Sequence, residues 1–128
     1  MLAQTIPHDL LTSLRLACVA LDSRKAESVK IFDVRGISPV TDFLIIASGN
    51  SPPHLKALRN AVTEEIRDRS VRGRGAPDEL DSGWIVIDAF DLIIHLFTEE
   101  QRAYYRLEGL YRDANKLEIE EILGSTPS

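Results

Sequence analysis

The chain has 128 residues, 44% of them hydrophobic, and its 20 acidic and 15 basic side chains give a net charge of −5. This length and composition are typical of one globular domain, which buries roughly 65–70% of the surface that its unfolded form exposes. The acidic balance disfavours binding to nucleic-acid backbones, DNA included, and it fits either a basic partner or a charge that serves solubility alone.

The single cysteine and the lack of membrane signals bear on the compartment. Cys18 is the only cysteine, so the chain cannot form an internal disulfide, which favours a reducing compartment. Its apolar neighbours indicate a small core side chain and not a nucleophile. The first residues lack the segments of a signal peptide, and no apolar run approaches the roughly 20 residues that span a bilayer. We expect a cytoplasmic protein without a membrane contact.

The first third of the sequence predicts one helix and two strands. Residues 9–23 place leucines and Cys18 at helical spacing, which predicts an amphipathic helix. Residues 29–34 are rich in β-branched and aromatic side chains, and residues 43–48 form a continuous apolar run typical of a strand covered on both faces. Because the two strands are so close in sequence, we expect them to pair as antiparallel neighbours.

A second helix is predicted from Ser51-Pro52 to about Arg69. The Ser51 hydroxyl can accept hydrogen bonds from free N–H groups, and proline at the first helical position loses no hydrogen bond. An apolar stripe follows at spacings of three and four: Leu55, Leu58, Val62 and Ile66. Residues 70–83 are rich in glycine and charged side chains, which predicts a loop that can hold a short edge strand near residues 71–75.

The next segment predicts a hairpin followed by a third helix. Residues 84–88 and 92–97 are apolar strands around a short acidic turn. Thr98 and Gln101 have the spacing of a capping box, in which each side chain binds the backbone N–H of the other residue. We expect the third helix to begin there and to be interrupted at Gly109.

The third helix is expected to turn apolar side chains toward the core: Tyr104, Leu107 and Leu110 or Tyr111. Residues 117–123 predict a last short amphipathic segment, and residues 125–128 are expected to fray. The order of elements indicates an α/β protein with a mixed sheet of four or five strands and flanking helices. We expect one domain over residues 1–128, with its core at about 9–114 and a C-terminal tail at 115–128.

Three sequence blocks, in order, cover residues from about 10 to 114. The first joins Asp33-Val34-Arg35-Gly36-Ile37-Ser38 to Thr41-Asp42-Phe43-Leu44-Ile45-Ile46-Ala47-Ser48-Gly49-Asn50-Ser51. The second is Trp84-x-x-x-Asp88-x-x-Asp91-x-x-x-His95-x-Phe97, and the third is Arg102-x-x-Tyr105-x-Leu107-Glu108-x-Leu110. Together they closely resemble the ribosomal silencing factors, the RsfS or Iojap family. Phe90 and Tyr111 depart from the family pattern, which has a small residue and a tryptophan at these places.

The resemblance implies a fold similar to nucleotidyltransferases but without catalysis or a cofactor, in a chain that forms a homodimer when free. Members of the family bind the large ribosomal subunit through its protein of the L14 family. They thereby block joining of the ribosomal subunits and repress translation when nutrients are limiting. An alternative within the same resemblance is an assembly factor that acts earlier, on immature large subunits.

An enzymatic alternative stays open because nucleotidyltransferases use this type of fold. Their reaction needs two or three carboxylates that converge on divalent metal ions. Gly49-Asn50-Ser51 offers a helix start that can bind an anion through free N–H groups. No strand carries alternating acids, however, and Asp88 and Asp91 are expected to point apart around their turn. We therefore expect no catalytic, cofactor-binding or metal-binding residues.

Two further polar residues are expected to serve the structure. His95 lies in an apolar strand, and neither of the other histidines is spaced to form a metal site with it. A lone histidine of this kind is usually a hydrogen-bonded core residue, and the resemblance implies that it joins the hairpin to the third helix. Asp42 is expected to cap a turn. Contact with a partner is the alternative for both.

The hairpin and the third helix are the expected protein-binding surface. Trp84 and Asp88 alternate along one strand and therefore share a face, where an aromatic anchor lies near a carboxylate. Acidic neighbours can steer a basic ribosomal protein toward this surface. The alternative for Trp84 is simple packing beneath the first helix. The expected contact residues are Trp84, Asp88, Asp91, Tyr105, Leu107 and Glu108.

Overall fold

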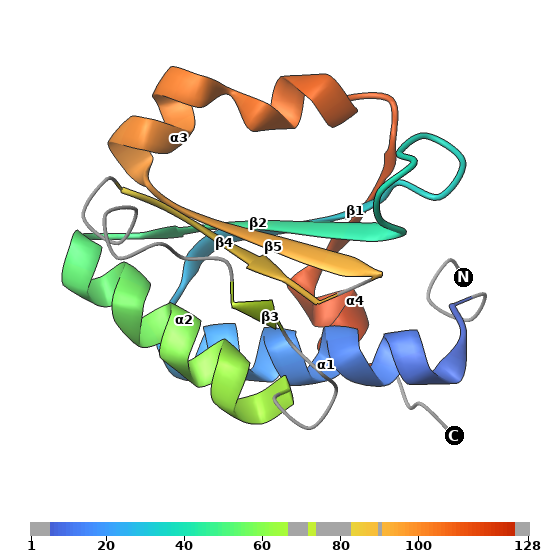
Figure 1. The fold of residues 1–128 in the computed structure, drawn as a ribbon, viewed down its shortest axis with the longest axis horizontal. Coiled ribbons are helices and arrows are strands. Elements are labelled where there is room, and N and C mark those ends of the chain that lie inside the picture. The colour runs from blue at the N-terminus through green and yellow to red at the C-terminus, as the bar shows by residue number, and fades with distance from the viewer. Residues whose placement is uncertain (1–5, 67–71, 74–82, 90, 125–128) are drawn as a thin grey trace.

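The computed structural model describes residues 6–66, 72–73, 83–89 and 91–124 (Figure 1). Its elements are α1 (His8–Ser23), β1 (Glu27–Asp33), β2 (Phe43–Gly49), α2 (Pro52–Ile66), β3 (Arg72–Gly73), β4 (Trp84–Asp88), β5 (Leu92–Thr98), α3 (Glu99–Tyr105), the 3₁₀ helix η4 (Leu107–Tyr111), β6 (Asn115–Glu118) and α4 (Ile119–Leu123). Most of the predicted loop at 70–83, Phe90 and residues 125–128 lie outside the described part. Within it, no helix has the length and apolar character needed to cross a membrane.

The strands form one mixed, six-stranded sheet in the order β3-β4-β5-β2-β1-β6. The central pair, β2 and β5, is parallel, and every other neighbouring pair is antiparallel. The predicted α/β class, the antiparallel pairing of the first two strands and the edge strand near residue 72 are confirmed. The sheet has one strand more than the four or five predicted, because β6 joins its edge beside β1.

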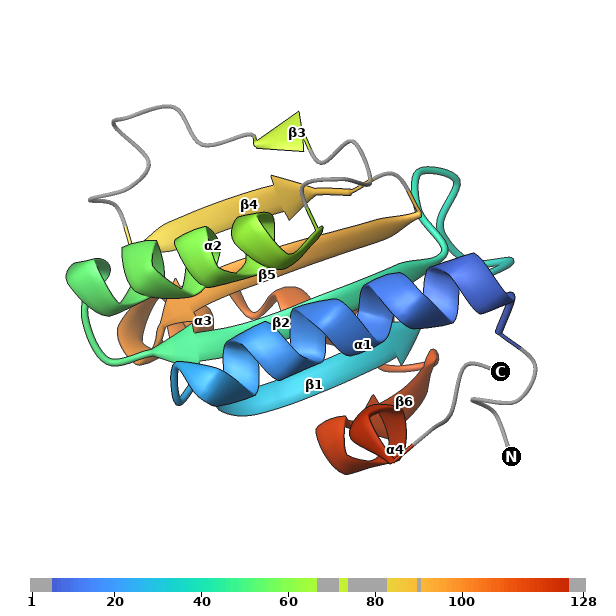
Figure 2. The same cartoon turned by 90° about the horizontal axis from the view of Figure 1, so that it is seen from below.

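Helices cover the two faces of the sheet unequally. α1, α2 and α4 pack on one face, here called the α1 face, over a large apolar cluster (Figures 1 and 2). α3 and η4 cross the opposite face, here called the α3 face (Figure 1), where a smaller buried cluster includes Phe32, Leu44 and Phe97. Cys18 is fully buried in the larger cluster, and burial raises the pKa of its thiol to about 12. Its predicted role as a core side chain is confirmed.

The sheet centre and the second helix follow their local signals. Every residue of β2 is buried, because the strand has neighbours on both edges and helices over both faces, which explains its continuous apolar run. α2 begins at Pro52 as predicted, with the Ser51 hydroxyl accepting the N–H of His54 at 3.2 Å. The apolar stripe of α2 is buried on the α1 face.

The segment after η4 returns to the sheet. Asn115–Glu118 pairs with β1 as β6, and α4 then packs on the α1 face. Arg15 holds the end of α4, since its Nη1 donates to the carbonyl oxygens of Ile122 at 2.8 Å and Leu123 at 2.7 Å. The predicted last amphipathic segment is therefore a strand followed by a helix, and both belong to the packed fold.

The third helix ends earlier than predicted. α3 stops at Tyr105 because Arg106 adopts a left-handed conformation, with φ 49° and ψ 44°, and the chain continues as η4. The interruption at Gly109 was therefore predicted at the wrong residue. Gly109 lies inside η4, and a Cβ added there would meet no atom within 4 Å.

The early break changes which side chains face the core. Tyr104 is 77% exposed, so its predicted inward direction is wrong. Of the alternatives Leu110 and Tyr111, Leu110 is 73% exposed. Leu107 and Tyr111 pack against the smaller cluster, as predicted. A continuous helix would have kept one apolar stripe, whereas the left-handed residue shifts the helical phase between the two halves.

Thr98 caps α3 through one of the two predicted hydrogen bonds. Its Oγ1 accepts the backbone N–H of Gln101 at 3.3 Å. The N–H of Thr98 donates instead to the carbonyl oxygen of Gly83 at 3.0 Å, so it is not available to the Gln101 side chain. The predicted reciprocal capping box is therefore only half formed, because the chain entering β4 takes the second donor.

Candidate functional site

β4 turns alternate side chains to opposite faces of the sheet. Ile85 and Ile87 are fully buried on the α1 face, whereas Trp84, Val86 and Asp88 are half-buried on the α3 face. The prediction that Trp84 and Asp88 share a face is confirmed. The alternative that Trp84 packs beneath the first helix is wrong, because α1 covers the other face.

Trp84 lies in an aromatic cluster built from β4, β5 and α3. The centroid of its ring lies 5.0 Å from that of Phe97, 4.6 Å from that of Tyr105 and 5.8 Å from that of His95. Phe97 is fully buried and Tyr105 is 49% exposed, so the cluster extends from the core to the surface through Trp84. Tyr104 continues it outward, edge-on to Tyr105 at 5.0 Å. Partly exposed aromatic side chains of this kind are typical anchors of protein–protein interfaces.

His95 binds Trp84 across the hairpin. The indole Nε1–H donates to Nδ1 of His95 at 3.0 Å, so this ring nitrogen has to be unprotonated. Burial lowers the pKa of His95 to about 4, because the charged imidazolium would lose its hydration. The prediction of a hydrogen-bonded structural histidine is confirmed, with the partner on the neighbouring strand and not on the third helix.

The two acidic residues of the second sequence block lie at the far end of the hairpin. Asp88 is half-buried at the end of β4, and Asp91 is exposed at the turn. The backbone carbonyl of Asp91 accepts the N–H groups of Asp42 at 3.1 Å and Phe43 at 2.9 Å, which fastens the turn to the start of β2. At about 3.3 Å per strand residue, Asp88 is roughly 13 Å from Trp84. The carboxylates therefore border the aromatic cluster from one end.

The third-block residues lie over different parts of the α3 face. Tyr105 packs on Trp84, and Leu107 packs against the smaller cluster. Glu108 turns back to Arg102, whose Nε and Nη2 donate to its carboxylate at 2.8 Å and 3.1 Å. These hydrogen bonds lower the pKa of Glu108. The structure thus brings Trp84 and Tyr105 together, and it places Glu108 in an internal ion pair.

Sequence reasoning missed two residues that build this site. Nη1 of Arg102 donates to the hydroxyl of Ser48 at 2.7 Å and to the carbonyl oxygen of Ser28 at 2.8 Å. Ser48 is 1% exposed, so its hydroxyl needs a partner inside the protein. The only available signal for Arg102 was its place at the head of the third sequence block, and the pattern does not indicate its partner on β2.

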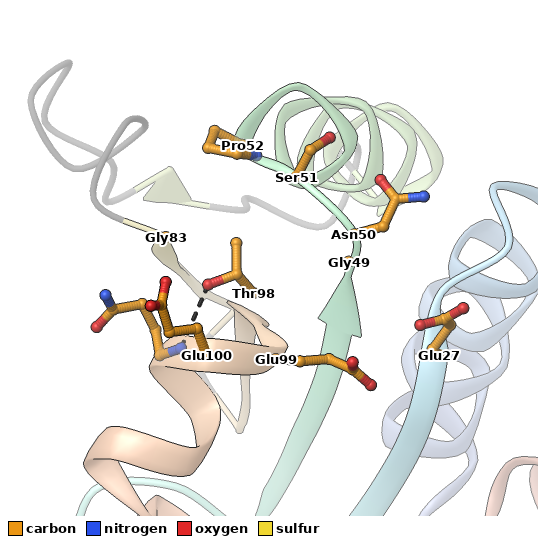
Figure 3. Close-up of a pocket in the computed structure, with 10 residues that line it drawn as sticks. Glu27, Gly49, Asn50, Ser51, Pro52, Gly83, Thr98, Glu99 and Glu100 are labelled. Carbon is orange, nitrogen blue, oxygen red and sulfur yellow. Dashed lines mark hydrogen bonds between the residues drawn. The ribbon is translucent and has the colours of Figure 1, made fainter.

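A cleft of about 480 Å³ opens at the carboxyl ends of β2 and β5 (Figure 3), where open α/β sheets commonly bind ligands. Its walls include the Gly49–Pro52 segment, Gly83 and the start of α3. Figure 3 shows the Glu99 side chain extending from α3 toward the strand that carries Glu27. With Glu100, these side chains make the lining acidic, which favours cations over phosphate groups.

The start of α2 offers few donors to an anion. Pro52 and Pro53 have no N–H group. The N–H of His54 donates to the Ser51 hydroxyl, and the N–H of Asn50 donates to Nδ1 of His54 at 2.9 Å. The N–H groups of Asn50 and His54 are therefore already bonded within the protein, which disfavours an anion site at this helix start. Among the described residues, no group of three or more His, Cys, Asp or Glu side chains is arranged to hold a metal ion.

Comparisons with known proteins agree on one family. A family model described as "Ribosomal silencing factor during starvation" matches residues 7–128. A "Ribosomal silencing factor RsfS" from Halalkalibacterium halodurans is 33% identical over 110 residues, covering 86% of this chain and 94% of that protein. "Protein Iojap, chloroplastic" from Arabidopsis thaliana is 33% identical over 112 residues, covering 88% of this chain and 46% of that protein. A crystal structure of a Chromobacterium violaceum protein has a TM-score of 0.71 at 25% identity, covering 84% of this chain and 88% of that one.

Proposed function

This chain belongs to the family of ribosomal silencing factors, and we propose that it binds the large ribosomal subunit through the protein of the L14 family. Bound there, it blocks joining of the ribosomal subunits and represses translation under nutrient limitation. The observation that carries the proposal is the contact of half-buried Trp84 with half-exposed Tyr105 on the α3 face. A docked partner can complete the burial of such a pair, which is why aromatic anchors contribute strongly to affinity.

The proposed contact surface follows the hairpin, α3 and η4: Trp84, Asp88, Asp91, Tyr105, Leu107 and Glu108. Val86 and Ile93 extend it, because both are half-buried on the same face of the hairpin. Its centre is thus aromatic and aliphatic. The carboxylates of Asp88 and Asp91 lie at one end, whereas that of Glu108 is paired with Arg102. This distribution suits a basic partner, since charges at the rim of an interface steer the encounter while the apolar centre supplies most of the affinity.

Repression in this proposal needs no turnover. A chain of 14.3 kDa that occupies the joining face of the large subunit takes space that the small subunit needs. Occupancy alone then sets the degree of repression. The acidic cleft and the proline-bearing start of α2 support a non-enzymatic role, because a nucleoside triphosphate would meet carboxylates and few free N–H donors there.

We also propose that the free chain is a cytoplasmic homodimer, as the family resemblance implies. The incompletely buried aromatic pair supports self-association as well as docking, because apolar side chains left partly exposed favour burial against another surface. Sedimentation equilibrium of the purified chain measures this state. We expect a mass of twice that of the chain, and a monomer at every accessible concentration would contradict the dimer.

Cosedimentation tests the main proposal. On gradients of ribosomes from nutrient-starved cells, the chain is expected with free large subunits and absent from joined ribosomes. Its presence on small subunits, or on no particle, would refute the assignment. Binding confined to immature large subunits would favour the assembly factor instead. A pull-down with the purified L14-family protein then identifies the contact, with Trp84→Ala as the variant expected to bind less.

A further inference from the structure

Arg102 connects α3 to three other segments of the protein. Its side chain is 12% exposed. The guanidinium donates to the hydroxyl of Ser48 in β2 at 2.7 Å, to the carbonyl oxygen of Ser28 in β1 at 2.8 Å, and to the Glu108 carboxylate in η4 at 2.8 Å and 3.1 Å. These bonds use most of its N–H donors, so little is left for a partner molecule. The role of Arg102 therefore lies inside the protein.

The backbone of β1 is shaped to receive this side chain. The register of β1 against β2 shifts between Glu27 and Lys30, and Ser28 within that interval has a left-handed φ of 50°. Such a bulge removes a carbonyl group from the regular ladder and re-aims it. Here the Ser28 carbonyl is the one that accepts from Arg102.

Arg102 and Tyr105 lie over the same row of the sheet. Ser48, Phe97 and Trp84 are direct neighbours on β2, β5 and β4. Arg102 binds Ser48 at one end of this row, and Tyr105 packs on Trp84 at the other. Residues three apart on a helix project in similar directions, so the last turn of α3 spans the row. Arg102 and Tyr105 thus hold the two ends of this turn over the row, one on Ser48 and the other on Trp84.

Arg102 also makes contacts across the bend between α3 and η4. The backbone N–H of Arg106 donates to the carbonyl oxygen of Arg102 at 3.0 Å, and the left-handed Arg106 then ends α3 and leads into η4. The left-handed conformation is unfavourable for an arginine, so surrounding contacts have to stabilise it at Arg106. The ion pair between Glu108 and Arg102 is such a contact, because it joins the two sides of the bend.

We infer that Arg102 is a positioning residue of the docking surface, which holds Tyr105 on Trp84 before any partner arrives. The effect on docking rests on the proposed function, whereas the effect on the aromatic pair concerns the free protein. Pre-ordering matters because an aromatic anchor that moves freely has to lose that freedom on binding. The loss weakens affinity by roughly two- to tenfold for one side chain.

Fluorescence of the free protein tests the positioning. Trp84 is the only tryptophan in the chain, so its emission reports on the contact with Tyr105. Arg102→Gln is expected to increase quenching by acrylamide and to move the emission to longer wavelength. Arg112→Gln removes the same charge at an exposed position and is expected to change neither. Wild-type emission from the Arg102→Gln variant would overturn the inference, whether or not the chain binds ribosomes.

A double-mutant cycle tests the consequence for docking. Arg102→Gln is expected to weaken binding to purified large subunits by roughly two- to tenfold, and Arg112→Gln by less than about twofold. In a Tyr105→Ala background, Arg102→Gln should add no further loss, since the ring that it positions is gone. An equal loss in both backgrounds would overturn the inference, because Arg102 would then act through other residues.

A milder variant covers the case in which Arg102→Gln does not fold. Ser48→Ala removes one acceptor of the guanidinium and is expected to shift the emission and the affinity in the same direction, by less. A Ser48→Ala variant identical to wild type in both would count against the inference. If the wild-type chain binds no large subunit, the proposed function fails. The fluorescence measurement then still decides whether Arg102 positions Tyr105.

Discussion

The indole N–H of Trp84 donates to Nδ1 of His95 across the β4–β5 hairpin at 3.0 Å. The bond places the one polar atom of the indole against the neighbouring strand, while Phe97 stacks on its ring and Tyr105 packs beside it. The orientation of Trp84 is thus set within the protein. A docking partner does not have to supply a hydrogen-bond acceptor to this donor.

Two substitutions of Trp84 separate its roles. Trp84→Phe keeps a ring but leaves Nδ1 of His95 without its donor, so we expect the free energy of unfolding to fall by about 1 kcal/mol. Trp84→Ala also removes the ring, and we expect the affinity for the L14-family protein to fall by tenfold or more, which is about 1.4 kcal/mol or more. Denaturation and binding measurements distinguish the effects. An unfolded Trp84→Ala variant would identify Trp84 as a core residue instead.

Stability should decrease as the pH falls below about 6.5, because His95 is neutral in the folded protein. Its pKa is about 4, against an ordinary value of 6.5. Between these values the unfolded chain binds a proton that the folded chain does not bind. The contribution of His95, of the order of 3 kcal/mol, is complete above pH 6.5 and is lost progressively toward pH 4.

Urea denaturation at several pH values between about 7 and about 4 measures this loss. His95→Gln cannot titrate, so the slope of its stability against pH should be shallower in that range. Parallel curves for the wild type and the variant would show that His95 is not responsible.

Gly83→Ala should destabilise the protein by more than backbone strain alone. Gly83 has φ +85°, and an added Cβ would lie 2.7 Å from Cγ of Gln101 and 2.9 Å from Oγ1 of Thr98, the residue that caps α3. Gly36 is the matched control, with φ +79° and no atom within 4 Å of an added Cβ. We expect losses of about 1–2 kcal/mol for Gly36→Ala and about 3 kcal/mol for Gly83→Ala in denaturation experiments. Similar losses would mean that the cap moves aside freely.

Charge reversal at Asp91 should slow docking mainly at low salt. Asp91 is exposed, and its backbone carbonyl, not its side chain, accepts the hydrogen bonds that fasten the turn to β2. Asp91→Lys should therefore leave the fold intact. Its charge acts at a distance, and salt screens such interactions. Stopped-flow association at about 0.05 M and about 0.5 M salt measures the effect. Glu65→Lys makes the same charge change at an exposed position of α2, and it should slow association less. A salt-independent effect would indicate direct contact at Asp91 and not steering.

Elements with strong local signals were predictable from the sequence. The Ser51-Pro52 pair starts α2, and the apolar run of β2 is buried on both faces. The hairpin was predictable because β4 alternates while the acidic turn divides it from β5. Each of these features depends on neighbours in sequence, which is the information that periodicity and capping patterns contain.

Elements that depend on distant contacts were not predictable. β6 buries only Leu117 among charged and polar neighbours, and its pairing with β1 gives it the form of a strand. The left-handed Arg106 has no sequence signal, since that conformation usually favours glycine. It shifted Tyr104 and Leu110 to the surface, against the helical periodicity.

The candidate site divides in the same way. Trp84 and Tyr105 were predicted from their sequence blocks, and the structure brings their rings within 4.6 Å. The hydrogen bond between Arg102 and Ser48 spans 54 residues of the chain, and no local pattern links the two. Glu108 was expected to contact a partner, and its ion pair with Arg102 became visible only in three dimensions.

The alternation of β4 has a consequence for evolutionary change. Ile85 and Ile87 pack in the core, so folding limits their replacement. Val86 and Asp88 lie half-buried on the other face of the same strand, so the proposed partner can constrain them without reaching the larger core cluster. Neighbouring residues of β4 are therefore constrained by different requirements, one by folding and the next by the proposed docking.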